Sequence, residues 1–155
     1  MGAHRMNVPK ELAEYKLERA EIVVYLPADW NISDHEEKNY WPLRWLKILA
    51  RLPLEEDSWL GWGHSVPNGK PFAENTQLSS VLLINPENVE EGAAVCQLPN
   101  GEEVNFYQMI PLYEEEVNFK IQNGAETLLG KMGEISAVVD IHRLNVCEGF
   151  GRSKE

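Results

Sequence analysis

The chain has 155 residues, of which 43% are hydrophobic and 25% are charged, and its formal net charge is −11. This length and composition are typical of one globular domain with a sizeable core. The sequence has no apolar run near the roughly 20 residues that span a bilayer, and its first residues lack the apolar stretch of a secretory signal. The acidic field argues against nucleic acid or an anionic membrane as partner and favours a basic protein, although an acidic surface that only confers solubility is an open alternative.

The first half of the chain predicts a short helix, a strand and a polar approach to a second helix. The helix covers Lys10–Glu18, and the strand covers Glu21–Pro27, where β-branched and aromatic residues end at a proline. The polar stretch Asp29–Asn39 follows, with Asp34 as a candidate N-cap.

The main core helix is predicted between the two prolines of the segment that begins at Trp41. Its apolar residues recur at helical spacing on one face. They are Trp41, Trp45, Ile48, Leu49 and Leu52. Pro42 suits a first helical turn, and Pro53 disfavours the helical conformation at the preceding residue, so the helix is expected to end at Leu52.

A loop rich in tryptophan and glycine follows this helix. We call Trp59, Gly61, Trp62, Gly63 and His64 the motif loop. Its glycines do not form the spacing of a dinucleotide-binding loop, so a phosphate cradle is excluded. His64 is a candidate metal ligand or general base, but no second histidine or cysteine stands at ligand spacing. A hydrogen-bonded structural histidine is therefore the favoured interpretation.

The second half of the chain predicts three strands, two helices and a last short strand. In chain order these are the strands 78–85, 93–98 and 103–112, the helices 113–121 and 125–131, and the strand 137–141. The turn Pro99–Gly101 is expected to join two of the strands into a hairpin. Because strands and helices do not alternate, the fold class is predicted as α+β, with a mixed, mainly antiparallel sheet and packed helices in a single domain over residues 1–147. Residues 148–155 are expected to form a flexible tail.

Clustered carboxylates are the candidate partner-binding residues, with solvated surface as the alternative interpretation. They are Glu55, Glu56, Asp57, Glu90, Glu91, Glu114, Glu115 and Glu116. The last three are expected in the first turn of a helix, where they complement its dipole.

The four histidines do not form a known catalytic or metal-binding pattern, so no enzyme, metal or cofactor is predicted. Asp140 and His142 would share one face of a strand and could orient a proton transfer, although ordinary structural reasons also place such a pair on one face. The two cysteines, Cys96 and Cys147, lie far apart and are expected to be reduced in a cytoplasmic protein.

Taken together, seven segments in a fixed order resemble the suppressor-of-fused domain family, in particular its bacterial branch. They are Glu21–Pro27, Trp41–Pro53, Gly61–Val66, Val81–Pro86, Val104–Glu116, Asn123–Leu129 and Val139–Arg143. The resemblance implies protein binding and not turnover. It implies an immunity protein that neutralises a cognate polymorphic toxin or, alternatively, a peptide-binding regulatory adaptor like the animal suppressor of fused.

One departure from the family concerns the start of the chain. Family members usually carry a helix and a β-hairpin before the stretch that matches Gly2–Pro9. If those strands are missing, a sheet edge is uncovered, and self-association through that edge is expected.

Overall fold

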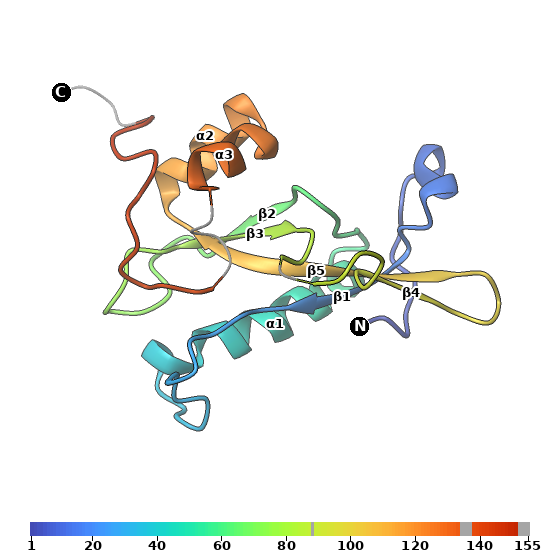
Figure 1. Cartoon of the computed structure of the whole chain (residues 1–155), viewed down its shortest axis with the longest axis horizontal. Helices are drawn as coiled ribbons and strands as arrows, with labels where there is room; N and C mark the ends of the chain where they lie inside the picture. Colours follow the sequence, from blue (N-terminus) through green and yellow to red (C-terminus); the bar gives the residue numbers. More distant parts are fainter. Residues whose placement is uncertain (88, 134–137, 152–155) are drawn as a thin grey trace. The chain divides into compact units, whose positions relative to one another are not determined.

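The structure, a computed structural model, describes residues 1–87, 89–133 and 138–151. Its helices and strands follow one another as expected for an α+β chain (Figure 1). They are the 3₁₀ helix η1 (Lys10–Tyr15), β1 (Arg19–Val23), α1 (Glu37–Glu55), β2 (Ser65–Pro67), β3 (Ser80–Ile84), β4 (Val95–Gln97), β5 (Glu103–Leu112), α2 (Glu114–Asn123) and α3 (Ala125–Met132).

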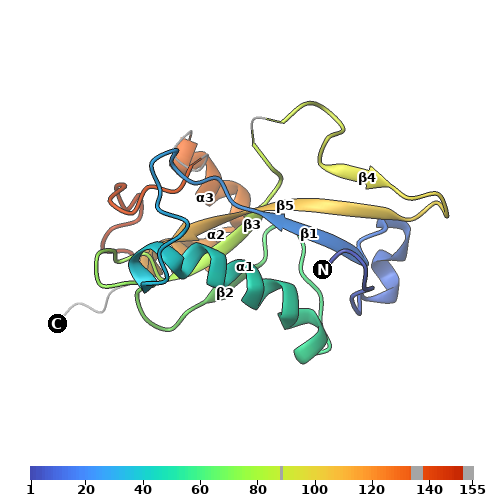
Figure 2. The ribbon, with the colours of Figure 1, turned by 90° about the horizontal axis from the view of Figure 1, so that it is seen from below.

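The strands form one mixed sheet, in agreement with the prediction. Its order is β1-β5-β3-β2, and β4 also pairs with β5. β1 runs parallel to β5, whereas β2 with β3 and β4 with β5 are antiparallel pairs. The hairpin predicted around Pro99–Gly101 is the β4–β5 pair, with Val95 opposite Asn105. Figure 2 shows β1 on one side of β5 and β4 on the other.

The chain divides into two compact units, each assembled from three separate stretches. The first contains residues 1–24, 42–64 and 83–109, and the second contains residues 25–41, 65–82 and the chain from Ile110 onward. In the first unit Ala20, Leu49, Leu60 and Leu83 are buried. In the second, the ring of Trp41 stacks on Phe72 with centroids 4.5 Å apart. Both units therefore contain buried apolar residues.

Several boundaries differ from the prediction. α1 begins at Glu37, so Pro42 lies beyond its first turn, and α1 continues through Pro53 to Glu55. Pro53 is buried. Leu52, the residue before Pro53, stays helical although a following proline disfavours that conformation. The packing of this segment therefore outweighs the conformational preference. α1 ends where Asp57 adopts a positive φ of 47°.

Asp34 does not cap α1 directly. Asp34 lies three residues before the first residue of α1. Its carboxylate accepts hydrogen bonds from the Glu36 backbone N–H at 3.0 Å and from the Asn39 side-chain amide at 2.8 Å. β1 begins two residues earlier than expected and ends at Val23. The short strand β2 falls where only a loop was predicted, and residues 138–141 form no strand. Residue 137 of that predicted strand lies outside the described residues.

Residues 148–151 form a turn, and the rest of the predicted tail is outside the described residues. The Phe150 ring contacts the Phe119 ring of α2 edge to face, with centroids 5.2 Å apart. This contact packs the turn against α2.

Candidate partner-binding surface

The five candidate carboxylates of the first unit are exposed. Glu55 is the last residue of α1, and Glu56 and Asp57 follow it directly. Glu90 and Glu91 lie in the loop between β3 and β4. Their exposure leaves these carboxylates accessible to a partner.

The three candidate glutamates of the second unit have different environments, although all stand in the first turn of α2 as predicted. Glu114 is exposed and Glu115 is half-buried. Glu115 accepts a hydrogen bond from the Asn145 amide at 3.0 Å. Glu116 is fully buried, with 0% of its side chain exposed. Only the first two can therefore contact a partner in this conformation.

Glu116 binds Arg143, a residue that sequence reasoning did not single out as functional. The guanidinium of Arg143 donates to Glu116 Oε2 at 2.7 Å and to the Pro111 carbonyl at 2.9 Å. The same carboxylate accepts the backbone N–H groups of Tyr113 at 2.9 Å and Val146 at 3.1 Å. Both partners thus have their charge and hydrogen-bonding groups satisfied, as a buried ion pair requires.

Tyr113 completes this buried cluster. Its hydroxyl donates to the Arg143 carbonyl oxygen at 2.5 Å, and the guanidinium lies 5.0 Å from the centre of its ring. Burial raises the pKa of the Tyr113 hydroxyl. The hydroxyl therefore remains a donor at neutral pH.

A groove of about 630 Å³ lies in the second unit. This volume falls within the range of ligand-binding pockets, roughly 300–1,000 Å³. We call residues 138–151 the strap, because the middle of this segment forms one wall of the groove. The other walls come from the turn after β2, from β3 and its approach, and from the start of α2. The lining residues include Pro67, Gly69, Lys70, Pro71, Ser79, Ser80, Tyr113, Glu114, Glu115, Arg143, Leu144, Asn145 and Glu148.

The motif loop lies in the first unit, where its polar groups are engaged locally. The Gly61 N–H donates to Nδ1 of His64 at 3.2 Å, and the His64 ring contacts Trp59 with centroids 4.5 Å apart. The Gly63 N–H donates to the Leu83 carbonyl at 2.7 Å. These contacts support the interpretation of His64 as a structural histidine. Trp62 is 39% exposed.

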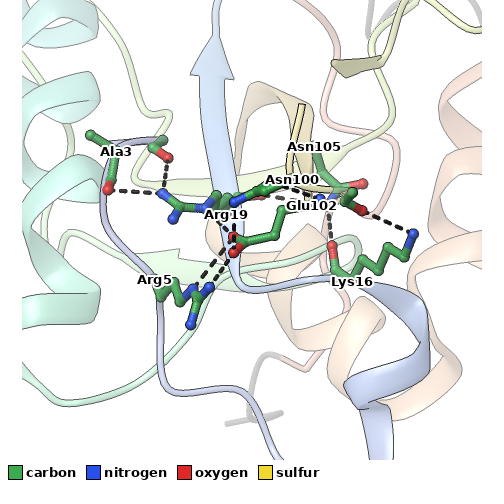
Figure 3. Close-up of polar contacts among 9 residues, drawn as sticks. Ala3, Arg5, Lys16, Arg19, Asn100, Glu102 and Asn105 are labelled. Atoms are coloured by element: carbon green, nitrogen blue, oxygen red, sulfur yellow. Dashed lines mark hydrogen bonds and ion pairs between the residues drawn. The ribbon is translucent and has the colours of Figure 1, made fainter. Parts of the chain in front are cut away.

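A charge cluster around Glu102 was missed by sequence reasoning (Figure 3). The Glu102 carboxylate binds the guanidinium groups of both Arg5 and Arg19. The pKa of Glu102 is lowered to about 2, and the largest cause is the hydrogen bond from Arg5, followed by the one from Arg19. Arg19 also donates to the carbonyl oxygens of Gly2 and Ala3 at 3.0 and 2.8 Å. The cluster therefore links the first residues of the chain to β1 and to the turn between β4 and β5.

Metal-binding clusters and membrane-spanning helices are both missing from the described part of the chain. Among residues 1–87, 89–133 and 138–151, no three or more histidine, cysteine or acidic side chains are grouped to hold a metal ion. Within these same ranges, every helix is too short or too polar to cross a bilayer.

Comparison with known proteins identifies relatives over most of the chain. The model of the suppressor of fused protein (SUFU) family matches residues 1–144. The uncharacterized protein UU111 of Ureaplasma parvum serovar 3 is 28% identical over 144 residues, which are 92% of this chain and 68% of that protein.

Solved structures of suppressor of fused proteins share the fold over 69% of this chain. The chain of the Sufu–Fu complex matches with a TM-score of 0.58 and 16% identity over 46% of its length. Drosophila Suppressor of Fused matches with a TM-score of 0.57 and 16% identity over 25% of its length. A putative SUFU homologue from Neisseria gonorrhoeae matches with a TM-score of 0.55 and 21% identity over 57% of its length. The chain thus spans only about a quarter to just over half of these solved chains.

Proposed function

Because the chain belongs to the suppressor of fused family, we propose that it is a non-enzymatic, protein-binding domain that acts as an immunity protein. In this role it binds a cognate polymorphic toxin in the cytoplasm of the bacterium that produces the toxin. The similarity to a chain solved as the Sufu–Fu complex supports protein binding as the general activity. The toxin as partner and the cytoplasm as location are parts of the proposal.

The observation that carries this proposal is the exposure of the clustered carboxylates. Seven of the eight candidate residues reach solvent, and only Glu116 is buried. A chain with a net charge of −11 attracts a basic protein surface and can cover a phosphate-binding cleft with carboxylates. Binding is therefore expected to weaken as salt rises, because exposed charge pairs are screened beyond about 10 Å at 0.1 M ionic strength.

The test begins with the DNA sequence around this reading frame, where the proposal expects a gene for a toxin-like secreted protein directly upstream. Co-expression with the chain is expected to restore growth of cells that make the toxin domain, and the purified proteins are expected to bind. A triple variant, Glu55→Gln, Glu56→Gln and Asp57→Asn, is expected to slow association. The matched control is Glu11→Gln with Glu14→Gln, which neutralises exposed carboxylates on η1. Affinity that is independent of salt would contradict the electrostatic basis of the proposal.

The alternative function is a peptide-binding adaptor. An adaptor would bind a short peptide of its partner, whereas an immunity protein would bind a folded toxin domain. β2 lies at the end of the strand order and, among the described residues, pairs with β3 alone, so one of its sides is a sheet edge there. Edge strands can bind an extended peptide by strand addition. Full affinity for an isolated peptide of the partner would favour the adaptor, whereas a requirement for the folded toxin domain would favour the immunity protein.

A further inference from the structure

Leu144 is the most exposed large hydrophobic residue of the described part of the chain, with 82% of its surface accessible. A single exposed leucine on a mobile segment would need no explanation. Leu144 instead lies in the strap, on the wall of the groove and directly after the buried Arg143.

The strap is hydrogen-bonded to other parts of the second unit at several points along its length. The Leu144 carbonyl accepts a hydrogen bond from Arg143 Nη1 at 2.9 Å, and two residues later the Val146 N–H donates to Glu116. Upstream, the Ile141 carbonyl accepts the hydroxyl of Thr76 at 3.0 Å. The backbone on both sides of Leu144 is thus tied to buried groups, and the leucine is held in solvent by a rigid segment. A preordered apolar side chain loses little conformational entropy when a partner covers it.

The groove beside Leu144 carries an excess of negative charge. Its carboxylates are Glu114, Glu115 and Glu148, whereas the charge of Arg143 is neutralised by Glu116. The remaining cation of the lining is Lys70. An entering side chain of opposite sign, from lysine or arginine, is therefore favoured.

The edge of β2 disfavours recognition by extended strand pairing at this groove. Hydrogen bonds from Leu83 N–H to the His64 carbonyl and from Asn68 N–H to the Ser79 carbonyl fix the register with β3. In this register the backbone groups of Ser65 and Pro67 face away from β3. Pro67 has no N–H to donate, so a strand added here would lose a hydrogen bond.

We propose that Leu144 and the groove next to it bind a segment of the partner in which a lysine or arginine adjoins an apolar side chain. The apolar side chain covers Leu144, and the basic side chain enters the groove between Glu114 and Glu148. This assignment rests on the proposed function, since it names the contact surface and the chemistry of the protein partner. Recognition depends on side chains and not on strand addition.

The direct test uses a peptide as probe and the full chain as it is. The tetrapeptide Arg-Leu-Arg-Leu, blocked at both ends, is titrated into the ¹⁵N-labelled chain, with Glu-Leu-Glu-Leu as its charge-reversed counterpart. The expected result is that the basic peptide shifts the amide signals of Gly69, Ser79, Leu144 and Asn145, and that the acidic peptide does not. Equal binding of the two peptides, or shifts confined to other residues, would overturn the assignment.

Variants separate the groove from general attraction to an acidic protein. Leu144→Ser and the double variant Glu114→Gln with Glu148→Gln are each expected to weaken peptide binding about tenfold, which corresponds to about 1.4 kcal/mol. Leu54→Ser is the matched control, because Leu54 is also exposed, at 62%, but lies on α1 in the first unit. Since all four residues are exposed, unchanged thermal unfolding is expected for each variant. Leu144→Ser with unaltered affinity would refute the role of Leu144.

Failure of this assignment is distinguishable from failure of the proposed function. If the toxin is neutralised equally well by the wild-type chain and by Leu144→Ser, the groove is not the contact surface and the immunity function stands. If the wild-type chain neutralises no toxin but the basic peptide binds in the groove, the binding site stands and the immunity function falls.

Discussion

Arg143 and Glu116 form an ion pair in which the side chains are 5% and 0% exposed. They are separated by 27 positions in the chain, and the pair fastens the strap to the start of α2. Glu116 also accepts the backbone N–H of Tyr113 at the N-terminus of α2, in the manner of a capping box. One carboxylate therefore stabilises a helix end and positions a wall of the groove.

The first prediction concerns loss of one partner of this pair. Glu116→Gln is expected to lower the free energy of unfolding by about 3–5 kcal/mol, because it leaves the guanidinium of Arg143 buried without a counter-charge. Urea unfolding followed by tryptophan fluorescence measures the change. Glu114→Gln, at an exposed position in the same helical turn, is the control and is expected to change stability by less than about 0.5 kcal/mol. Equal stability of the two variants would show that the pair does not hold the strap.

The sheet and the helices of the second half of the chain could be predicted because local signals were strong. β5 has the predicted bounds, Glu103–Leu112, and its hairpin with β4 follows from a proline–asparagine–glycine turn. A continuous apolar run such as Val81–Ile84 is typical of a strand buried on both faces, and all five residues of β3 are buried. α3 begins at the predicted Ala125 and ends one residue later than expected, next to Gly133.

The roles of the charged residues could not be predicted, because they depend on contacts between distant segments. Three consecutive glutamates look alike in the sequence, yet only Glu116 is buried against Arg143. Likewise, Glu102 binds Arg5 and Arg19, which lie more than 80 positions earlier. Local rules also failed at Pro53, where packing continues a helix that the residue preference would end.

The second prediction is an acid-dependent loss of stability that originates at Glu102. Its folded-state pKa of about 2 lies below the ordinary value of 4.5. A depressed carboxyl pKa contributes stability that is present above the unfolded pKa and is lost as pH falls through the folded one. Over the window from 4.5 to about 2, the stability advantage of the wild-type chain over Glu102→Gln is therefore expected to shrink. Unfolding in urea at a series of pH values measures it.

A companion measurement identifies the cause of the shift. The side-chain hydrogen bond from Arg5 makes the largest contribution to the lowered pKa of Glu102. Arg5→Gln is therefore expected to raise the pKa of Glu102, observed as a carboxyl carbon titration by NMR. If this titration is unaffected by Arg5→Gln, the contact drawn in Figure 3 does not persist in solution.

The third prediction compares two glycines. A Cβ atom at Gly61 would lie 2.7 Å from a ring carbon of Trp59, so Gly61→Ala is expected to displace that ring from His64 and to destabilise the chain. Gly130 is exposed on α3, and a Cβ atom there would meet no other atom within 4 Å. Gly130→Ala is therefore expected to stabilise the chain by about 0.5–1 kcal/mol. Thermal unfolding is expected to show a lower midpoint for Gly61→Ala and a higher midpoint for Gly130→Ala. If both midpoints shift in the same direction, the packing described for one of the two glycines is contradicted.

The fourth prediction concerns the aromatic core of the second unit. Trp41 is 1% exposed and stacks on Phe72, with Trp30 edge-on at 6.2 Å. Trp41→Ala is expected to cost about 3–5 kcal/mol, because it removes a large ring from a packed site.

Trp41→Phe is expected to cost much less than Trp41→Ala. It keeps a ring on Phe72 and removes an indole N–H that is buried and finds no hydrogen-bond acceptor within the described residues. A buried donor without an acceptor is itself unfavourable by about 1–3 kcal/mol, so its removal offsets part of the lost packing. The control is Trp62→Phe at the half-exposed motif-loop position, where little change is expected. Urea unfolding, followed by circular dichroism so that loss of a tryptophan does not alter the signal, ranks the three variants. A Trp41→Phe variant as unstable as Trp41→Ala would show that the N–H has an acceptor in solution.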